Sequence, residues 1–262
     1  MRDYFIKTKE FIWDILDEQV EYYAASLSFY TVFAIIPLLL IVLSIFTSLP
    51  TFAEYYENIK GFIFSNLFPT NTDVVSNYID SFLKNSFKMG VVGFIYILFT
   101  SFLFFKNYEF IISQIFHTKP RKFLDAITIY WTLITLTPIG IIISFYLSHY
   151  IQDLLNTSTL TNNINFLTIV PFLIIWLLFF VTYKISANLE VRTKTALISS
   201  FLASLTWYLA KSLFIYYVFY NKTYSSLYGS FSTILFFFLW IYFSWIIFLY
   251  GLRVCYKIDY KK

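Results

Sequence analysis

The sequence predicts an all-α fold, a polytopic membrane protein built as a bundle of six transmembrane helices. Three observations support this prediction: the charged residues are bunched, the stretches between them have the length of a membrane span, and Lys and Arg are biased to one side. Only 13% of the residues are charged, and 59% are hydrophobic. A bilayer core needs about 20 apolar residues per helix, so each long uncharged stretch is a candidate span.

The uncharged stretches position the spans along the chain. Those without any Asp, Glu, Lys or Arg are Ala24–Ala53, Ala126–Gln152, Leu154–Tyr183 and Thr223–Leu252, and the stretches Met89–Phe105 and Thr195–Ala210 each end at an interior lysine. We therefore expect spans at about 24–48, 89–112, 125–150, 164–186, 195–219 and 229–251, all within a single membrane domain over residues 1–262.

The stretch at about 50–88 is the one sizeable segment outside the predicted spans. Phe52, Tyr55, Ile59 and Ile63 recur in it at helical spacing, and a second such series follows Pro69. We predict a short amphipathic helical region on the extracytoplasmic side. It forms either a lid over a cavity or a hairpin lying in the membrane interface.

The distribution of basic residues predicts the orientation, because Lys and Arg accumulate in cytoplasmic loops. One predicted side collects Arg2, Lys7, Lys9, Lys119, Arg121, Lys122, Arg192, Lys194, Arg253, Lys257, Lys261 and Lys262, whereas the other has Lys60, Lys84, Lys88 and Lys222. We therefore expect both termini to be cytoplasmic.

Charged residues inside the predicted spans are candidate functional residues, because placing a charge in lipid is costly. Lys106 and Glu109 are three residues apart near the cytoplasmic end of the second span. They could pair on one helix face, or the lysine could extend to the interface. Lys211 lies about two turns inside the outer end of the fifth span, where it either lines a polar cavity or reaches the outer interface.

Polar residues and prolines in the first and third spans suggest a substrate path. Ser26, Tyr30 and Pro37 share one stripe of the first span, and Pro138 interrupts the third. A proline leaves one helical carbonyl without its donor, and in lipid that carbonyl needs a partner or a water-lined cavity. Ordinary packing of bent helices explains the same residues equally well.

The fifth span also carries a small-residue face, made of Ala196, Ser200 and Ser204 in line with Lys211. Small residues allow helices to approach closely and hydroxyl groups to bond across the gap. This face is a candidate surface for packing within the chain or for docking a partner.

The composition limits the chemistry. A single cysteine, Cys255, excludes an internal disulfide and a cysteine-based metal cluster, and the sequence has no Gly-rich phosphate loop or other catalytic motif. The net charge of +4 is concentrated at helix ends and forms no nucleic-acid patch. We expect no enzymatic activity, no catalytic residue, no metal, no cofactor and no nucleic-acid partner.

Several motifs occur in an order that resembles the YihY/BrkB family of bacterial inner-membrane proteins (UPF0761-type, historically mislabelled ribonuclease BN). The motif residues are Ala24 to Pro37, Tyr130 to Thr132, Thr135 to Pro138, Ala210, Lys211, Phe214, Tyr217, Tyr228 to Phe231, Leu239 to Tyr242 and Gly251. Tyr228, Gly229, Trp240, Gly251 and Asn188 are the positions that the resemblance marks as family motif residues. The chain departs from the family pattern at Ala187, at Ser199–Ser200 and at Arg253.

The resemblance implies a six-helix fold in the bacterial inner membrane and a connection with cell-envelope properties such as serum resistance and lipid export. It also carries the ribonuclease label, which the residues argue against. RNA cleavage needs clustered carboxylates with metal ions, or a paired acid and base. The cytoplasmic loops offer only isolated groups, among them His117, Asp125 and Glu190.

Two functions follow as hypotheses. The first is a transporter or flippase-like protein for an envelope lipid or another amphipathic solute, without ATP hydrolysis of its own. In this hypothesis membrane lipid is the partner, Lys211 neutralises an anionic head group, and Lys106 and Glu109 gate the cytoplasmic end. The alternative is a non-transporting scaffold for envelope assembly, which binds an envelope protein or a second copy of itself through the small-residue face.

Overall fold

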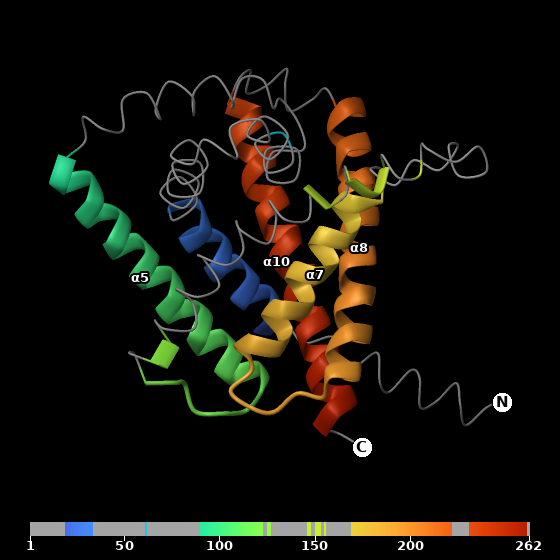
Figure 1. Ribbon diagram of the computed structural model, residues 1–262. Helices are drawn as coiled ribbons and strands as arrows, with labels where there is room; N and C mark the ends of the chain where they lie inside the picture. The colour runs from blue at the N-terminus through green and yellow to red at the C-terminus, as the bar shows by residue number, and fades with distance from the viewer. Residues whose placement is uncertain are drawn as a thin grey trace.

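The computed structural model (Figure 1) describes residues 19–33, 61, 90–122, 125–126, 146–147, 150–152, 155, 169–221 and 231–260. The regular elements in these residues are all α-helices: the helix of residues 19–33, α5 (Gly90–Ile115), α7 (Val170–Ser186), α8 (Thr193–Tyr220) and α10 (Phe231–Tyr260). The predicted all-α class is therefore confirmed for the described part of the chain.

Four of the predicted spans coincide with labelled helices. The spans at 89–112, 164–186, 195–219 and 229–251 fall on α5, α7, α8 and α10. The span at 24–48 begins inside the helix of residues 19–33 and continues beyond the described residues. Most of the span at 125–150, and of the amphipathic region at 50–88, also lies outside them, so six spans stay a prediction.

Among the described residues, two helices are long and apolar enough to cross a membrane. They are α8, over Thr193–Tyr220, and the Leu235–Tyr260 part of α10, and α7 is a shorter apolar helix. At 1.5 Å per residue, α8 is about 42 Å long, which exceeds a hydrocarbon core of about 30 Å.

The C-terminal helix continues beyond its predicted end near residue 251 and reaches Tyr260. The extra turns are charged, yet Cys255 and Lys257 are buried in the bundle. The carboxylate of Asp259 accepts a hydrogen bond from the backbone N–H of Arg192, at 2.9 Å. These contacts hold the extension in helical form, which hydropathy alone could not indicate.

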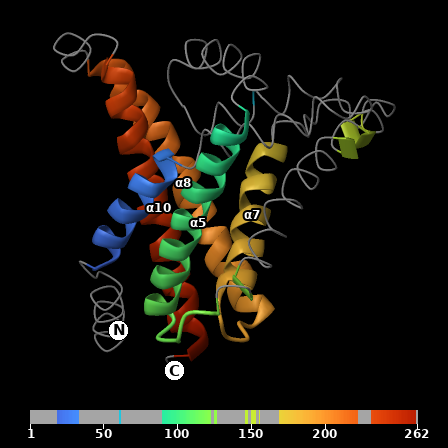
Figure 2. The same ribbon diagram turned by 90° about the vertical axis from the view of Figure 1, so that its left-hand side faces the viewer.

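The helices form a bundle with one end rich in charged residues. In Figure 1, α5, α7 and α10 finish at the lower end of the molecule, and α8 begins there. Figure 2 shows α5 in front of α8 and α10, with α7 to the right. We call the lower end the basic end; its described basic residues include Lys119, Arg121, Lys122, Lys184, Arg192, Lys194, Arg253 and Lys257.

The helix α5 ends in a tight reversal of the chain. His117 has a left-handed backbone, with φ of 50°. The N–H of Thr118 donates to the carbonyl of Ser113 at 2.9 Å, and the N–H of His117 donates to Gln114 at 3.2 Å. This pair of bonds satisfies carbonyls that a helix end would otherwise leave without donors. The reversal directs the following loop back along the bundle.

The helices α7, α8 and α10 approach one another closely at Gly251. A Cβ atom at this position would lie 2.5 Å from the Cβ of Ala203 on α8, and closer still to the hydroxyl of Tyr183 on α7. The Tyr183 side chain is fully buried, and its hydroxyl donates to the carbonyl of Phe248 at 2.8 Å. Only glycine leaves room for this arrangement.

Replacement of Gly251 by alanine should therefore destabilise the bundle. We expect a loss of about 1–3 kcal/mol in the free energy of unfolding, the usual cost of overpacking. Thermal unfolding in detergent measures this loss. Gly61→Ala is the matched control, because a Cβ at Gly61 has nothing within 4 Å. Equal stability of the two variants would contradict the packing argument.

Candidate functional site

Lys211 lies in the half of α8 that is remote from the basic end. It precedes the last residue of the helix by about 14 Å at 1.5 Å per residue. Its side chain is half-buried, and its Nζ lies 5.9 Å from the centroid of the Trp207 ring. The negative face of an indole ring stabilises a cation at this distance. Lys211 is therefore held against the bundle on one side.

The ring below Lys211 is fixed by its own contacts. Trp207 donates its indole N–H to the Ser244 hydroxyl of α10 at 3.0 Å. Its ring centroid lies 5.2 Å from that of Trp240, and the Phe214 ring lies 5.2 Å from Trp240 on another side. These rings belong to a buried apolar cluster with Ile175 and Phe236. The Lys211 side chain thus contacts an aromatic ring that packing and a hydrogen bond hold in place.

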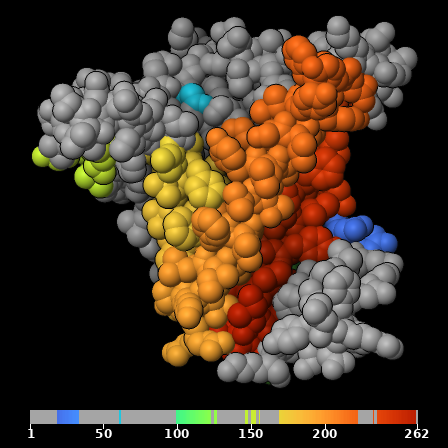
Figure 3. All heavy atoms as spheres, turned by 90° about the vertical axis from the view of Figure 1, so that its right-hand side faces the viewer, coloured from blue at the N-terminus to red at the C-terminus, as the bar shows by residue number. Residues whose placement is uncertain are grey.

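The other side of Lys211 meets a broad apolar surface. Figure 3 shows α8 crossing this face of the molecule, with α7 on one side of it and α10 on the other. The exposed large apolar side chains of α8 are Leu197, Ile198, Phe201, Leu202, Leu205, Tyr208, Leu209, Leu213, Ile215, Tyr216, Tyr217, Phe219 and Tyr220. An apolar surface of this length, on a helix able to cross a membrane, fits contact with lipid chains.

At the basic end, Glu109 pairs with Arg121. The side chains are 7% and 10% exposed, and Arg121 Nη1 lies 3.6 Å from Glu109 Oε2. The backbone N–H of Arg121 also donates to Glu109 Oε1 at 2.8 Å. Lys106, one turn before Glu109, has an exposed side chain. The structure therefore joins Glu109 to a loop residue, which the spacing of Lys106 and Glu109 did not indicate.

Arg121 also binds the C-terminal end of α7. Its guanidinium donates to the carbonyls of Ile185, Ser186 and Ala187, at 2.9, 3.1 and 2.6 Å. The last carbonyls of a helix lack intrahelical donors, and a cation there also interacts favourably with the helix dipole. The Tyr108 hydroxyl lies 2.8 Å from the Ser186 hydroxyl and forms a hydrogen bond with it. One arginine thus connects α5, the following loop and α7.

Further polar contacts close the basic end between α7, α8 and α10. Asn188 donates to the carbonyl of Lys119 at 3.1 Å. Arg192 forms an ion pair with Asp259, which also accepts a hydrogen bond from Thr195 at 3.1 Å. The hydroxyl of Tyr260 donates to the carbonyl of Glu190 at 2.8 Å. The carboxylates of Glu109 and Asp259 therefore both have partners inside the chain.

The polar stripe of the first predicted span joins helices. The amide of Asn107 on α5 donates to the Ser26 hydroxyl at 3.0 Å. The Trp245 indole of α10 donates to the Thr31 hydroxyl, beside the stripe, at 2.9 Å. Tyr30 is half-buried next to Phe29, with ring centroids 5.6 Å apart. For Ser26 the packing explanation is the one that the contacts support.

The small-residue face of α8 is buried within the chain. Ala196, Ser200 and Ser204 are all 0% exposed. The indole of Trp176 on α7 donates to the Ser200 hydroxyl at 3.2 Å. Of the two explanations for this face, packing within the chain is the one that its burial supports, because α7 and α10 pack on α8.

The family motif residues within the described part of the chain have packing roles. Trp240 is 1% exposed in the aromatic cluster below Lys211. Gly251 allows a close approach of three helices, and Asn188 joins two loops. Tyr228, Gly229, Pro37 and Pro138 lie outside the described residues. Their proposed roles stay predictions.

Sequence reasoning missed Arg121 and Asn107 as structural residues. Arg121 was counted only as one of several loop cations, and nothing in its neighbours distinguishes it from Lys119 or Lys122. Asn107 stands between Lys106 and Tyr108, and a polar amide inside a predicted span was a usable signal. Within the described ranges, no three His, Cys, Asp or Glu side chains lie close enough to hold a metal ion.

The architecture is that of a helical membrane protein, and comparison with known proteins supports this class. The chain belongs to the family described as Virulence factor BrkB, whose model matches residues 12–262. A UPF0761 membrane protein of Haemophilus influenzae (strain 86-028NP) is 33% identical over 90% of this chain and 88% of its own length.

Two further relatives carry the same name. The UPF0761 membrane protein of Mannheimia succiniciproducens is 35% identical over 88% of this chain and 82% of its own length. That of Pseudoalteromonas atlantica is 29% identical over 90% and 80%, respectively. No solved structure matches the chain.

Removal of the Arg121 side chain should destabilise the basic end strongly. Arg121→Ala leaves Glu109 as a buried charge without this partner and exposes three helix carbonyls, so we expect a loss of about 3–5 kcal/mol. Thermal unfolding in detergent is the measurement. Lys119→Ala is the control, since only the backbone carbonyl of Lys119 is used by Asn188. A matching loss in Lys119→Ala would show that loop charge, not the Arg121 contacts, matters.

Proposed function

We propose that this protein moves an envelope lipid, or another amphipathic solute with an anionic head group, across the bacterial inner membrane without hydrolysing ATP. The observation that carries the proposal is the position of Lys211. It is a half-buried cation on an apolar helix, lying between a fixed aromatic surface and the exposed apolar face of α8. The names of the relatives say that they are membrane proteins and give no substrate.

The proposed orientation places the basic end in the cytoplasm. Lys and Arg are retained on the cytoplasmic side of bacterial membranes, and this end holds Arg121, Lys122, Arg192 and Lys194 among others. The opposite end of α8 carries exposed aromatic side chains, including Tyr216 and Tyr220. Such residues are enriched at membrane interfaces. In this orientation α8 runs outwards, and Lys211 lies in the outer half of the membrane.

A lysine at this depth is costly to place in a membrane. Placing a lysine at the centre of a spanning helix costs about 2.5–3.5 kcal/mol on insertion scales. The sequence of α8 contains no acidic residue, and Trp207 supplies one face of the cation environment. A lipid phosphate approaching along the exposed face of α8 would add an anionic contact. In our proposal this contact stabilises the head group while it passes the apolar interior.

The scaffold alternative is less well supported. It relied on Ala196, Ser200 and Ser204 as a docking surface, and these residues are fully buried against the other helices of the same chain. The exposed face of α8 consists of large apolar side chains instead. Its chemistry matches lipid chains, which favours a protein that handles lipid.

Lipid translocation in proteoliposomes tests the proposal. The purified protein should move labelled phosphatidylglycerol faster than empty liposomes do. Lys211→Ala should lower this rate about fivefold, because one lysine–phosphate contact contributes about 1 kcal/mol. Lys211→Arg should retain most of the rate, since it keeps the charge.

The control variant is Lys194→Ala, which removes an exposed lysine from the first turn of the same helix. Its rate should equal that of the unaltered protein. Transport without any dependence on Lys211 would remove the lysine from the path. Absence of movement with every lipid tested, in protein shown to be folded, would overturn the proposed function itself.

A further inference from the structure

A second lysine lies in a setting that points to lipid, on the other side of the bundle. The exposed side chains Phe102, Lys106 and Phe110 follow one another at intervals of four residues along α5. Residues at this spacing share one helix face. Lys106 is therefore a cation within an exposed aromatic stripe, which continues one turn earlier with Phe99.

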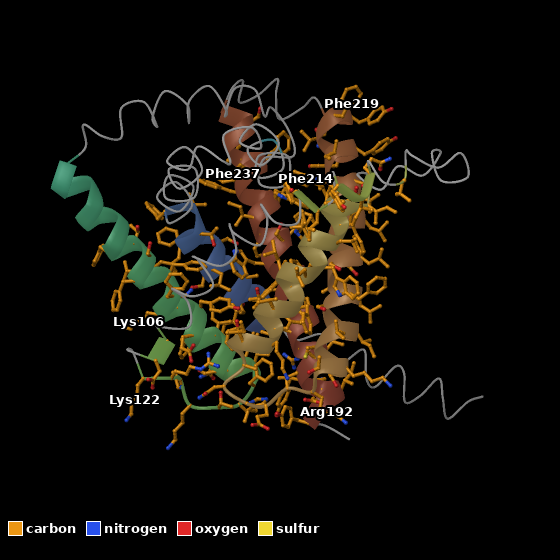
Figure 4. The ribbon with its side chains drawn as sticks, viewed as in Figure 1. Lys106, Lys122, Arg192, Phe214, Phe219 and Phe237 are labelled. Carbon is orange, nitrogen blue, oxygen red and sulfur yellow. The ribbon has the colours of Figure 1, made fainter. Side chains whose placement is uncertain are left out.

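The loop after α5 brings another lysine to the same side of the bundle. The backbone N–H of Arg121 donates to the Glu109 carboxylate at 2.8 Å, and Glu109 is only one turn from Lys106. Lys122, the next residue in the chain, is exposed. Figure 4 shows Lys106 and Lys122 on the same outer side of the lower half of α5. The long stems of both lysines allow their ammonium groups to extend toward the surroundings.

The local charges leave these lysines available for an anion. Glu109, the acidic residue nearest to Lys106 on α5, is buried in its pair with Arg121. Within the described residues, Lys106 takes part in no ion pair. Asp125, three residues after Lys122, is exposed and takes part in no ion pair with a described residue. The stripe thus presents two cations beside an apolar surface.

We propose that this face of α5 and the following loop form a binding site for an anionic phospholipid of the cytoplasmic leaflet. Lys106 and Lys122 bind the head-group phosphate, and an acyl chain lies along Phe102 and Phe99. A phosphate alone would use the lysines without the aromatic stripe, whereas a phospholipid uses both. The site is on a different helix from Lys211, and binding there does not depend on whether the protein translocates lipid.

Native mass spectrometry of the purified protein in detergent, titrated with phosphatidylglycerol or phosphatidylcholine, tests this site. We expect phosphatidylglycerol to bind more tightly than phosphatidylcholine. Lys106→Ala and Lys122→Ala should each weaken its binding about fivefold, and the double variant about 25-fold, as two contacts of about 1 kcal/mol each imply. Lys194→Ala should leave the affinity unchanged. Equal affinity in the double variant would overturn the proposal.

A second measurement uses the unaltered protein and does not depend on how the variants fold. In nanodiscs that contain phosphatidylglycerol, Lys106 and Lys122 should react more slowly with an amine-modifying reagent than in nanodiscs of phosphatidylcholine alone, whereas Lys194 should not change. Equal reactivity in both would overturn the proposal. So would equal protection by inorganic phosphate, because that result would assign the lysines to a free anion.

Discussion

The bundle depends on a tight contact at Gly251, where α7 and α8 meet α10 and no space is left for a side chain. The buried Tyr183 hydroxyl occupies the space that a side chain at this position would fill, and it donates to a carbonyl of α10 one turn earlier. The fully buried serines of α8 maintain the same closeness along that helix. On the side of this contact remote from the basic end lies the aromatic cluster around Trp240. The position of Trp207, and with it the environment of Lys211, therefore follows from how closely the three helices can approach.

The basic end follows a different principle, in which buried polar groups bind one another. Glu109 binds Arg121, Asp259 binds Arg192, and free carbonyls at the end of α7 accept hydrogen bonds from an arginine. Buried charges remain stable when they are paired and hydrogen-bonded. Lysines with exposed side chains, such as Lys106 and Lys122, are left to interact with the surroundings. The use of arginine for the buried contacts is consistent with these roles, since a guanidinium can bind several carbonyls at once.

The sequence was sufficient to predict the helical class and four of the helices, because runs of apolar residues of this length have few alternatives in water or lipid. It could not predict that α10 continues to Tyr260, since the stabilising contacts come from Arg192, far away in the chain. The pairing of Glu109 was missed for the same reason: local spacing suggested Lys106, while a chain reversal at His117 brings Arg121 closer. The serines of α8 were correctly recognised as small packing residues, but the partner helix could not be read from their spacing. Lys211 was identified because a lone charge in an apolar helix is visible without any knowledge of the fold.

The arginine that caps α7 has a mechanical consequence. The backbone N–H of Arg121 donates to the carboxylate of Glu109 on α5. Its guanidinium donates to three successive carbonyls at the end of α7. A sliding of one helix past the other by a single turn, about 5.4 Å, would break all of these bonds together. These bonds couple α5 to α7. The two helices can tilt together, but they cannot slide past each other along their axes while the bonds are kept. If the bundle opens while the Arg121 contacts are kept, it must open at other helix interfaces, and α5 and α7 then move together.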